Sequence, residues 1–315
     1  MGRPRALVSH PSIVDVAGSG GIPESLAFDV WDGHDLAAAL AGYAGLVCLL
    51  TDRVNAAVLT ANPDLAVVAN VAVGYDNIDL AAARRLGIVI TNAPGVLTDA
   101  TADLAMALIL GTARRLPEAD AFVRDGRWTS FHLLPDLIGV DVYGATLGIV
   151  GMGRIGQAVA RRAAHGFGMR VLYHSRTRLP DDSVPAHPVP LEQLLAEADF
   201  VSLHAPSTPQ TWHLIGAAEL AQMKASAILV NTSRGPLVDE EALVDALARG
   251  QIAGAGLDVF EAEPTVHSGL LALRDRVVLL PHLGSATRRT RRDMAATALA
   301  NAAAVLRGEP PPNPV

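Results

Sequence analysis

The second half of the chain alternates short apolar runs with segments of helical pattern. Stretches with a helical pattern, such as 155–165, 191–198 and 240–249, lie between the runs. Continuous apolar strands that alternate with helices are typical of a parallel sheet covered on both faces. The pattern therefore predicts a doubly wound, dinucleotide-binding α/β architecture. Its six expected strands are 147–150, 171–174, 200–205, 228–232, 255–260 and 277–281.

The first hundred or so residues show a weaker form of the same alternation. Strands are expected at 46–51, 65–71 and 88–91, and helices at 35–41, 55–61 and 79–86. The sequence Asn92-Ala93-Pro94-Gly95 then interrupts the pattern, as expected of a hinge. A smaller α/β domain is therefore predicted before this hinge.

A helix that is apolar on nearly all sides is expected at 99–116. Such a helix must be buried, either between domains or against another subunit. Because one small domain would struggle to cover it, we expect a homodimer whose interface includes this helix. The tail at 287–306 is predicted to be a helix that returns to the first domain, followed by a frayed, proline-rich end.

Composition excludes several classes of protein. Half of the residues are hydrophobic and 18% are charged, which is typical of a compact globule rather than a disordered chain. The formal charge of -7 argues against nucleic acid as a main partner. The amino terminus lacks the apolar core of a signal peptide, and the longest apolar stretch is well short of the roughly 20 residues that cross a bilayer. A cytoplasmic protein without a membrane partner is expected.

A glycine-rich segment indicates where a dinucleotide would bind. Gly151, Gly153 and Gly156 follow the strand at 147–150 and open a helix. At this position glycines let backbone amides approach a pyrophosphate, whose charge is favoured by the helix N-terminus. The same spacing also occurs in ordinary tight turns between a strand and a helix, so the surrounding strand and helix support the prediction.

The residues after the second strand bear on the choice of cofactor. An enzyme that prefers NAD places a carboxylate about 20 residues past the glycine loop, where it binds the ribose 2′-hydroxyl. Here the segment contains Ser175, Arg176, Thr177 and Arg178 and no carboxylate. A hydroxyl and one or two guanidinium groups suit a 2′-phosphate, so we expect NADPH to be preferred, with NAD possible. The alternative is that these arginines are solvated loop residues.

Three polar segments follow three consecutive strands of the second half. They contain Arg234, Glu263 and His282. Each type of residue has an ordinary structural role, since arginines are usually solvated and lone histidines usually packed. The carboxyl ends of parallel strands meet at one edge of the sheet, where ligands bind in open α/β folds. A cation, a carboxylate and an imidazole are therefore expected to lie together beside the dinucleotide.

These motifs resemble those of the D-isomer-specific 2-hydroxyacid dehydrogenase family, especially its glyoxylate/hydroxypyruvate reductase branch. The likeness covers essentially the whole chain, including the segment 70–79, which resembles the family's substrate loop. It implies two Rossmann-like domains with parallel sheets, the cofactor domain being inserted into the substrate domain. The implied substrate domain is 1–97 with 287–315, and the implied cofactor domain is 98–286. In the family the active site lies in the cleft between them.

The resemblance implies reduction of a small 2-oxo acid, with a role for each residue. His282 would donate the proton that the developing alkoxide needs, and Glu263 would orient the imidazole and favour its charged form. Arg234 would bind the substrate carboxylate with its fixed fork. Substrate contacts are further expected from Ala72, Val73 and Gly74, and cofactor contacts from Thr101, Gly151, Gly153, Arg154, Ile155, Gly156, Ser175, Arg176, Thr177, Ala205, Pro206, Thr211, Thr232, Ser233, Asp258 and Gly284.

The same motifs are also compatible with other functions. Transcriptional corepressors of this fold keep the three catalytic residues and use the nucleotide as a structural ligand. A phosphite-type anion dehydrogenase would use the same cationic site, and so would another D-2-hydroxyacid dehydrogenase. Formate dehydrogenases pair the histidine with glutamine, which Glu263 argues against. No metal site is expected, because the histidines and Cys48 lack ligand spacing.

Overall fold

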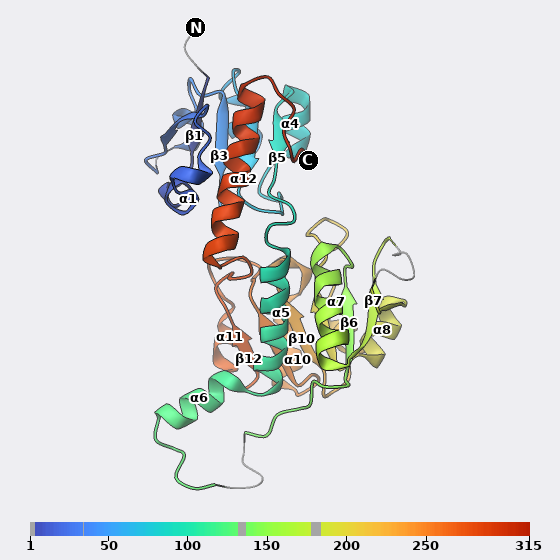
Figure 1. Cartoon of the computed structure of the whole chain (residues 1–315). Helices are drawn as coiled ribbons and strands as arrows, with labels where there is room; N and C mark the ends of the chain where they lie inside the picture. Colours follow the sequence, from blue (N-terminus) through green and yellow to red (C-terminus); the bar gives the residue numbers. More distant parts are fainter. Residues whose placement is uncertain (1–3, 34, 132–136, 178–183) are drawn as a thin grey trace. The chain divides into compact units, whose positions relative to one another are not determined.

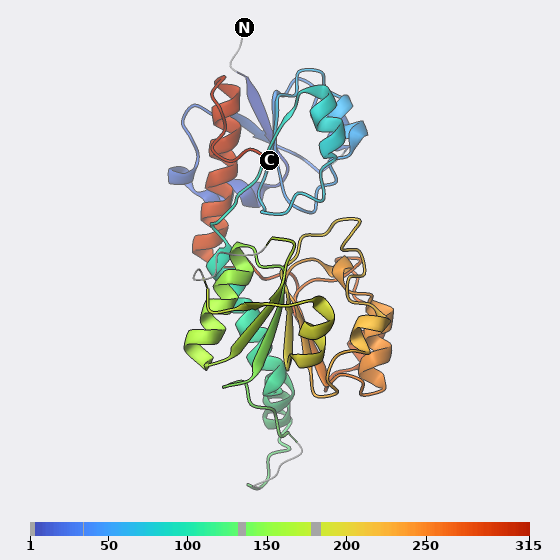
Figure 2. The same cartoon turned by 90° about the vertical axis from the view of Figure 1, so that its right-hand side faces the viewer.

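The chain folds as two compact α/β units. The computed structural model describes residues 4–33, 35–131, 137–177 and 184–315. Unit 1 comprises Met1–Leu97 and Ser285–Val315, and unit 2 comprises Thr98–Gly284. Each unit has a sheet of parallel strands flanked by helices, which Figures 1 and 2 show from two sides. The prediction of two Rossmann-like α/β folds is confirmed.

The sheet of unit 1 has the strand order β2-β1-β3-β4-β5. The strands are β1 (Arg5–Val8), β2 (Ala27–Val30), β3 (Gly45–Cys48), β4 (Val67–Asn70) and β5 (Val89–Thr91). One face is covered by α1 (Pro11–Ala17) and α12 (Arg288–Leu306), and the other by α2 (Leu36–Ala39), α3 (Ala56–Thr60) and α4 (Leu80–Leu86) (Figure 2). The interior strands β3 and β4 are buried along their whole length, which explains their continuous apolar sequence.

Local sequence signals explain where the helices of unit 1 begin and end. The side chains of Asn55 and Asp79 accept hydrogen bonds from the amides of Val58 and Ala82, and so cap α3 and α4. Gly87 ends α4 in the left-handed conformation, with φ of 72°.

Two features of unit 1 differ from the prediction. Strands β1 and β2 were not expected. Strand β1 has an apolar run of only three residues after the exposed Arg5, and the edge strand β2 is partly exposed and is interrupted by Asp29. The expectation of a frayed tail is wrong. The amide of Val315 donates to the Ile90 carbonyl (2.9 Å) and that of Asn92 donates to the Asn313 carbonyl (3.3 Å). The tail is therefore hydrogen-bonded along the edge of β5.

The sheet of unit 2 has the strand order β12-β11-β10-β9-β6-β7-β8. The strands are β6 (Thr146–Val150), β7 (Arg170–His174), β8 (His187–Pro188), β9 (Phe200–Leu203), β10 (Ile228–Asn231), β11 (Gly254–Leu257) and β12 (Val277–Leu279). All six predicted strands are present, and the short, exposed β8 is additional. The strand order reverses direction at β6, between β7 and β9, and such a switch point is where open α/β sheets bind ligands.

Helices cover both faces of this sheet. They are α5 (Thr98–Ala113), α6 (Leu116–Arg124), α7 (Arg154–Phe167), α8 (Leu191–Glu197), α9 (Ala217–Leu220), α10 (Glu240–Ala248) and α11 (Ser268–Ala272). Helices α5 and α7 pack side by side on one face (Figure 1), and the core of the other face includes residues of α8, α9 and α10. Within the described residues, no helix is both long and apolar enough to span a membrane.

The apolar helix α5 is covered within its own unit. It packs against α7 and against β10, β11 and β12. Its exposed positions are Asp99, Asp103 and Ala107, and both aspartates pair with Arg162 of α7. The argument that one domain could not cover this helix is therefore wrong. Helix α6 was not expected. It begins at Leu116 and has Pro117 in its first turn, where proline is favoured.

Candidate active site

The glycine loop lies at the switch point of the unit 2 sheet. Gly151 has φ of 97°, and a Cβ there would lie 2.5 Å from the Ala205 amide nitrogen. A Cβ on Gly156 would lie 2.3 Å from the Gly151 carbonyl oxygen, so both positions require glycine for close packing. A Cβ on Gly153 would instead have open space around it, with nothing among the described residues within 4 Å beyond its own chain neighbours and helix backbone. The loop thus combines tight packing with an open side at the start of α7.

The residues around this loop fit a dinucleotide. Helix α7 begins after Gly153 without a side-chain cap, so its first amides, including those of Arg154 and Ile155, can bind an anion. Thr232, at the end of β10, has a buried Oγ1 with no hydrogen-bond partner among the described residues. A buried hydroxyl without a partner is costly, and a ligand that completed its hydrogen bonds would remove that cost.

The residues predicted to select the cofactor follow β7, the neighbour of β6 in the sheet. Ser175 is partly buried, and Arg176 and Thr177 are exposed. The described part of this segment, up to Thr177, contains no carboxylate. Arg178 lies outside the described residues.

The loop after β9 is tied to the loop after β10. Thr211 donates through Oγ1 to the Pro206 carbonyl (2.7 Å), and its oxygen accepts from the Thr208 amide (2.8 Å). The Ser233 hydroxyl donates to the Ala205 carbonyl. Hydrogen bonds thus involve four of the cofactor contacts predicted after these two strands: Ala205, Pro206, Thr211 and Ser233.

Asp258 is a buried carboxylate that organises the loop after β12. It accepts hydrogen bonds from the amides of Leu283 (2.6 Å) and Gly284 (2.8 Å), while Thr101 donates to the Gly284 carbonyl (3.0 Å). Burial raises the pKa of Asp258, although the two amides oppose the shift. Its backbone carbonyl accepts from the amide of His282, which has φ of 55°. Asp258 therefore stabilises the loop that presents the histidine.

His282 and Glu263 form a direct pair. His282 Nδ1 lies 2.8 Å from Glu263 Oε2, and both side chains are partly exposed. The other carboxylate oxygen, Oε1, accepts from the Phe260 amide (3.0 Å). Burial alone would raise the pKa of Glu263, but the hydrogen bond and charge of the His282 ring outweigh it and hold this pKa below its usual value. Because a carboxylate only accepts hydrogen bonds, Nδ1 carries the shared proton.

Arg234 lies near this pair, at the end of the β10 loop. Its charge helps to lower the pKa of Glu263. Asn231 fixes the loop, because its Nδ2 donates to the Arg234 carbonyl (2.8 Å) and its Oδ1 accepts from the Ser233 amide (3.0 Å). Strands β10, β11 and β12 are neighbours, so the unit 2 sheet brings the cation, the carboxylate and the imidazole to one edge.

The predicted substrate loop follows β4 in unit 1. Asn70 donates to the Gly74 carbonyl (2.7 Å), Asn92 donates to the Val73 carbonyl (2.8 Å), and the Ala93 amide donates to the Ala72 carbonyl (2.9 Å). With these carbonyls held, the amides of residues 72–74 have no acceptor within the described residues. Three neighbouring amides of this kind can bind an anion.

Sequence reasoning missed several residues that shape these loops. Asn70 and Asn92 hold the substrate loop, and their signal is an asparagine at or just beyond the end of a buried strand. His213, Asp239 and Glu261 form a cluster whose potential ligand atoms lie within 4.8 Å of one another. These three residues are far apart in the sequence, so no spacing motif indicates that they lie together.

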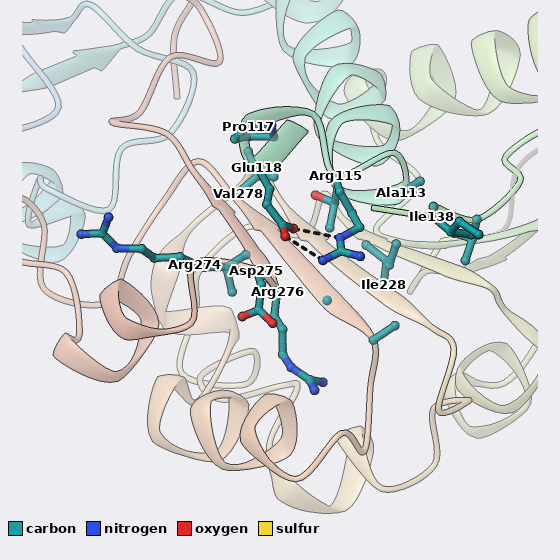
Figure 3. Close-up of a pocket in the computed structure, with 16 residues that line it drawn as sticks. Ala113, Arg115, Pro117, Glu118, Ile138, Ile228, Arg274, Asp275, Arg276 and Val278 are labelled. Atoms are coloured by element: carbon teal, nitrogen blue, oxygen red, sulfur yellow. Dashed lines mark hydrogen bonds and ion pairs between the residues drawn. The ribbon is translucent and has the colours of Figure 1, made fainter. Parts of the chain in front are cut away.

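A cavity lies at the opposite edge of the unit 2 sheet. Its volume is about 270 Å³. Ile228, Gly254 and Val277, the first residues of β10, β11 and β12, line it together with Arg115 and Glu118, which form an ion pair beside it (Figure 3). Because the catalytic candidates follow the carboxyl ends of these strands, this cavity is not part of the candidate active site.

Comparison with known proteins agrees with this geometry. Residues 106–284 match the family model described as D-isomer specific 2-hydroxyacid dehydrogenase, NAD binding domain. The glyoxylate reductases of Thermococcus litoralis and Korarchaeum cryptofilum are 54% and 55% identical over 274 and 271 residues. These alignments cover 85% of this chain and 82% and 81% of the relatives.

Solved structures give the same result. The NADPH-dependent glyoxylate/hydroxypyruvate reductase of Sinorhizobium meliloti, in complex with NADP and malonate, has a TM-score of 0.89 and 37% identity, with coverage of 100% of this chain and 97% of that one. A protein from Thermus thermophilus has a TM-score of 0.88 and 48% identity, with 99% of each chain covered. The chain belongs to the D-isomer-specific 2-hydroxyacid dehydrogenase family and is a nicotinamide-dependent oxidoreductase.

Proposed function

We propose that the protein reduces a small 2-oxo acid, glyoxylate or hydroxypyruvate, to the 2-hydroxy acid with NADPH. The observation that carries this proposal is the pair between His282 Nδ1 and Glu263 Oε2, with the charge of Arg234 beside it, on the sheet edge that also carries the glycine loop. The names of the relatives, glyoxylate reductase and glyoxylate/hydroxypyruvate reductase, support the substrate class.

His282 is the proposed proton donor. The bound nicotinamide supplies a hydride to the carbonyl carbon, and the carbonyl oxygen then needs a proton. Glu263 engages Nδ1, so Nε2 is the ring nitrogen that delivers the proton in reduction and accepts it in oxidation. The lowered pKa of Glu263 keeps the carboxylate charged at neutral pH, so it can accept the Nδ1 proton and fix the orientation of the ring.

The substrate carboxylate is the proposed ligand of Arg234 and of the loop after β4. A guanidinium offers two parallel donors in a fixed plane, which suits a carboxylate. In unit 1 the amides of Val73 and Gly74 form a backbone anion site whose carbonyls are held by Asn92 and Asn70. This second assignment rests on the geometry of the loop itself and on the family resemblance.

A substrate panel tests the proposed function. NADPH oxidation would be measured with glyoxylate, hydroxypyruvate, pyruvate and a branched 2-oxo acid, and NADP reduction with phosphite. Turnover of glyoxylate or hydroxypyruvate with the highest kcat/KM is expected. Tight nucleotide binding without turnover of any substrate would favour a corepressor-like binding protein, and turnover of phosphite alone would favour an inorganic anion dehydrogenase.

Cofactor choice is proposed to depend on Ser175 and Arg176. Arg176 is exposed and follows β7, where a 2′-phosphate of NADPH would replace the hydroxyl of NADH. We expect Arg176→Ala to raise the KM for NADPH about tenfold, because one charge-assisted hydrogen-bonding partner is lost, and to change the KM for NADH less than about twofold. Steady-state kinetics with both cofactors measure this difference.

A matched control and a clear contrary result are available for this experiment. Arg161→Ala removes another exposed arginine from the same unit, on α7, and should leave both KM values unchanged. Equal or higher kcat/KM with NADH in the unmodified protein would show that the proposed preference is wrong.

A homodimer is also proposed, through the surface of α6 and the segment that follows it. Trp128 (64% exposed), Phe131 (83%) and Tyr143 (79%) are large apolar or aromatic side chains in this segment, and Leu116 and Ile138 are more than half exposed. Exposed aromatic residues gathered in one segment mark an interaction surface. This surface replaces α5 as the basis for the proposal.

Charged replacements test the dimer. We expect light scattering to give twice the chain mass for the unmodified protein at micromolar concentration. The double variant Trp128→Asp, Phe131→Asp should give the monomer mass, because two charges would have to be desolvated in the interface. Leu271→Asp, at an exposed leucine of α11, is the control and should remain a dimer. A monomeric unmodified protein would contradict the proposal.

A further inference from the structure

His213 lies between two carboxylates on the catalytic edge of the unit 2 sheet. Its Nε2 is buried and lies 3.0 Å from Glu261 Oε1, and its Nδ1 lies 3.8 Å from Asp239 Oδ2, so both contacts are within ion-pair distance, although the described residues give Nε2 no hydrogen bond. His213 belongs to the loop after β9, Asp239 precedes α10 in the connection after β10, and Glu261 follows β11. One imidazole therefore joins the loops of three adjacent strands.

The same three loops are also linked through their backbones. The amides of Glu240 and Glu261 each donate to the other residue's carboxylate, at 3.0 and 2.8 Å, and the His213 amide donates to the Pro236 carbonyl (2.8 Å). A Cβ on Gly235 would lie 1.9 Å from the carbonyl carbon and oxygen of Phe260, so the two backbones are in direct contact there. The β10 and β11 loops are thus packed together next to Arg234 and Glu263.

The geometry of the cluster favours a bridge rather than a metal site. The two ring nitrogens of His213 face different carboxylates: Nδ1 faces Asp239 and Nε2 faces Glu261. A metal ion could bind only one of the two nitrogens. Glu261 Oε1 already accepts the Glu240 amide, and Asp239 Oδ1 caps α10 by accepting the Ala242 amide. A neutral imidazole has one N–H for these carboxylates, and a charged imidazole has two.

The charged groups around His213 come from each packed element. Asp239 and Glu240 come from the start of α10 and Glu261 from the β11 loop, while His267, at the start of α11, faces Glu240. Burial raises the pKa of Glu240, and the charge of Glu261 adds to this shift. His213 thus lies among acidic residues whose charges repel one another.

We propose that His213 is a positioning residue, which holds the loop of Glu263 against the loop of Arg234 by bridging Asp239 and Glu261. Glu263 is two residues from Glu261, and Arg234 directly precedes Gly235, so a shift of either loop would change the orientation of His282 and the place of the guanidinium. The inference rests on the proposed roles of Arg234, Glu263 and His282.

The test uses His213→Asn, since asparagine tolerates the left-handed backbone at this position (φ of 50°) but is too short to bridge both carboxylates. We expect kcat for glyoxylate to fall roughly 10-fold to 100-fold, the scale of a misplaced catalytic group, with the KM for NADPH unchanged within about twofold. The alkaline limb of the kcat/KM profile should move to lower pH, because a displaced Glu263 stabilises the charged ring of His282 less.

Two further variants keep the test independent of folding. Glu261→Gln preserves the size of the side chain and its acceptor for the Glu240 amide but removes the charge, and it should move the pH profile in the same direction. His213→Gln, which reaches one carboxylate, should recover part of kcat. His187→Ala, at an exposed histidine of β8, is the matched control and should change neither kcat nor the profile.

Three outcomes would overturn the inference. The first is a folded His213→Asn variant with the unmodified kcat and pH profile. The second is a lower melting temperature in that variant with unchanged kinetics, which would indicate a purely structural role. The third is an increase in melting temperature with added Zn²⁺ that disappears in His213→Asn while the pH profile stays the same, which would indicate a metal site. His282→Ala, measured in parallel, separates the two proposals: if it retains activity, the proposed mechanism fails, whatever the result for His213.

Discussion

Replacement of His282 by alanine is expected to lower kcat for 2-oxo acid reduction by about 10²–10⁴-fold, the usual contribution of a positioned general acid. The backbone of His282 is left-handed, and the imidazole is paired through Nδ1 with Glu263. Among the catalytic residues proposed for unit 2, no other group is placed to donate a proton where Nε2 does. The binding of NADPH should be largely retained, because all the proposed cofactor contacts except Gly284 lie in other loops, and Asp258 holds the Gly284 amide independently of the imidazole. Pre-steady-state and steady-state kinetics with glyoxylate, together with nucleotide titration, measure both quantities.

His165→Ala is a suitable control for this experiment. His165 is exposed in the last turn of α7, and its loss should leave kcat unchanged. Near-normal reduction by His282→Ala would show that the proposed proton donor is wrong. Reduced nucleotide affinity with normal kcat would instead assign the histidine to cofactor binding.

The catalytic edge of unit 2 was predictable because its strands are strongly patterned. The apolar runs before Arg234, Glu263 and His282 are parallel neighbours in the sheet, as continuous buried strands between helices indicate. Parallel neighbours end at the same edge, so the proximity of Glu263 and His282 follows from sequence pattern and from the geometry of the sheet alone.

Elements with weak patterns were missed for physical reasons. Strand β2 is partly exposed, β8 has two residues, and α6 has Pro117 in its first turn, although proline is also a common stop signal. The tail was expected to fray because local composition does not show that Val315 and Asn313 hydrogen-bond with residues more than two hundred positions away, Ile90 and Asn92.

Contacts between loops could not be predicted either, because no pattern in the sequence indicates them. Asp258 accepts the amides of residues 283 and 284, and His213 approaches Asp239 and Glu261, although no periodicity relates these positions. Such contacts depend on loop conformation. Here His213 and His282 have a left-handed backbone, which residues other than glycine rarely adopt.

Arg234→Ala is expected to lower kcat/KM for glyoxylate by about 30-fold to 1000-fold, since loss of one partner from a desolvated charge pair costs roughly 2–4 kcal/mol. The KM for the oxo acid should rise and kcat should fall, because the guanidinium is proposed to bind the carboxylate and to polarise the carbonyl. The KM for NADPH should change little. Saturation kinetics with glyoxylate and with NADPH separate these effects.

Arg234→Lys separates charge from geometry in this experiment. Lysine keeps the positive charge but lacks the planar fork, so it should recover only part of the lost kcat/KM. Arg249→Ala, which removes an exposed arginine paired with Asp245 on α10, is the matched control and should behave like the unmodified protein. If Arg234→Ala bound and reduced glyoxylate normally, the substrate carboxylate would have to be held by other donors, and the backbone amides of Val73 and Gly74 would be the first to test.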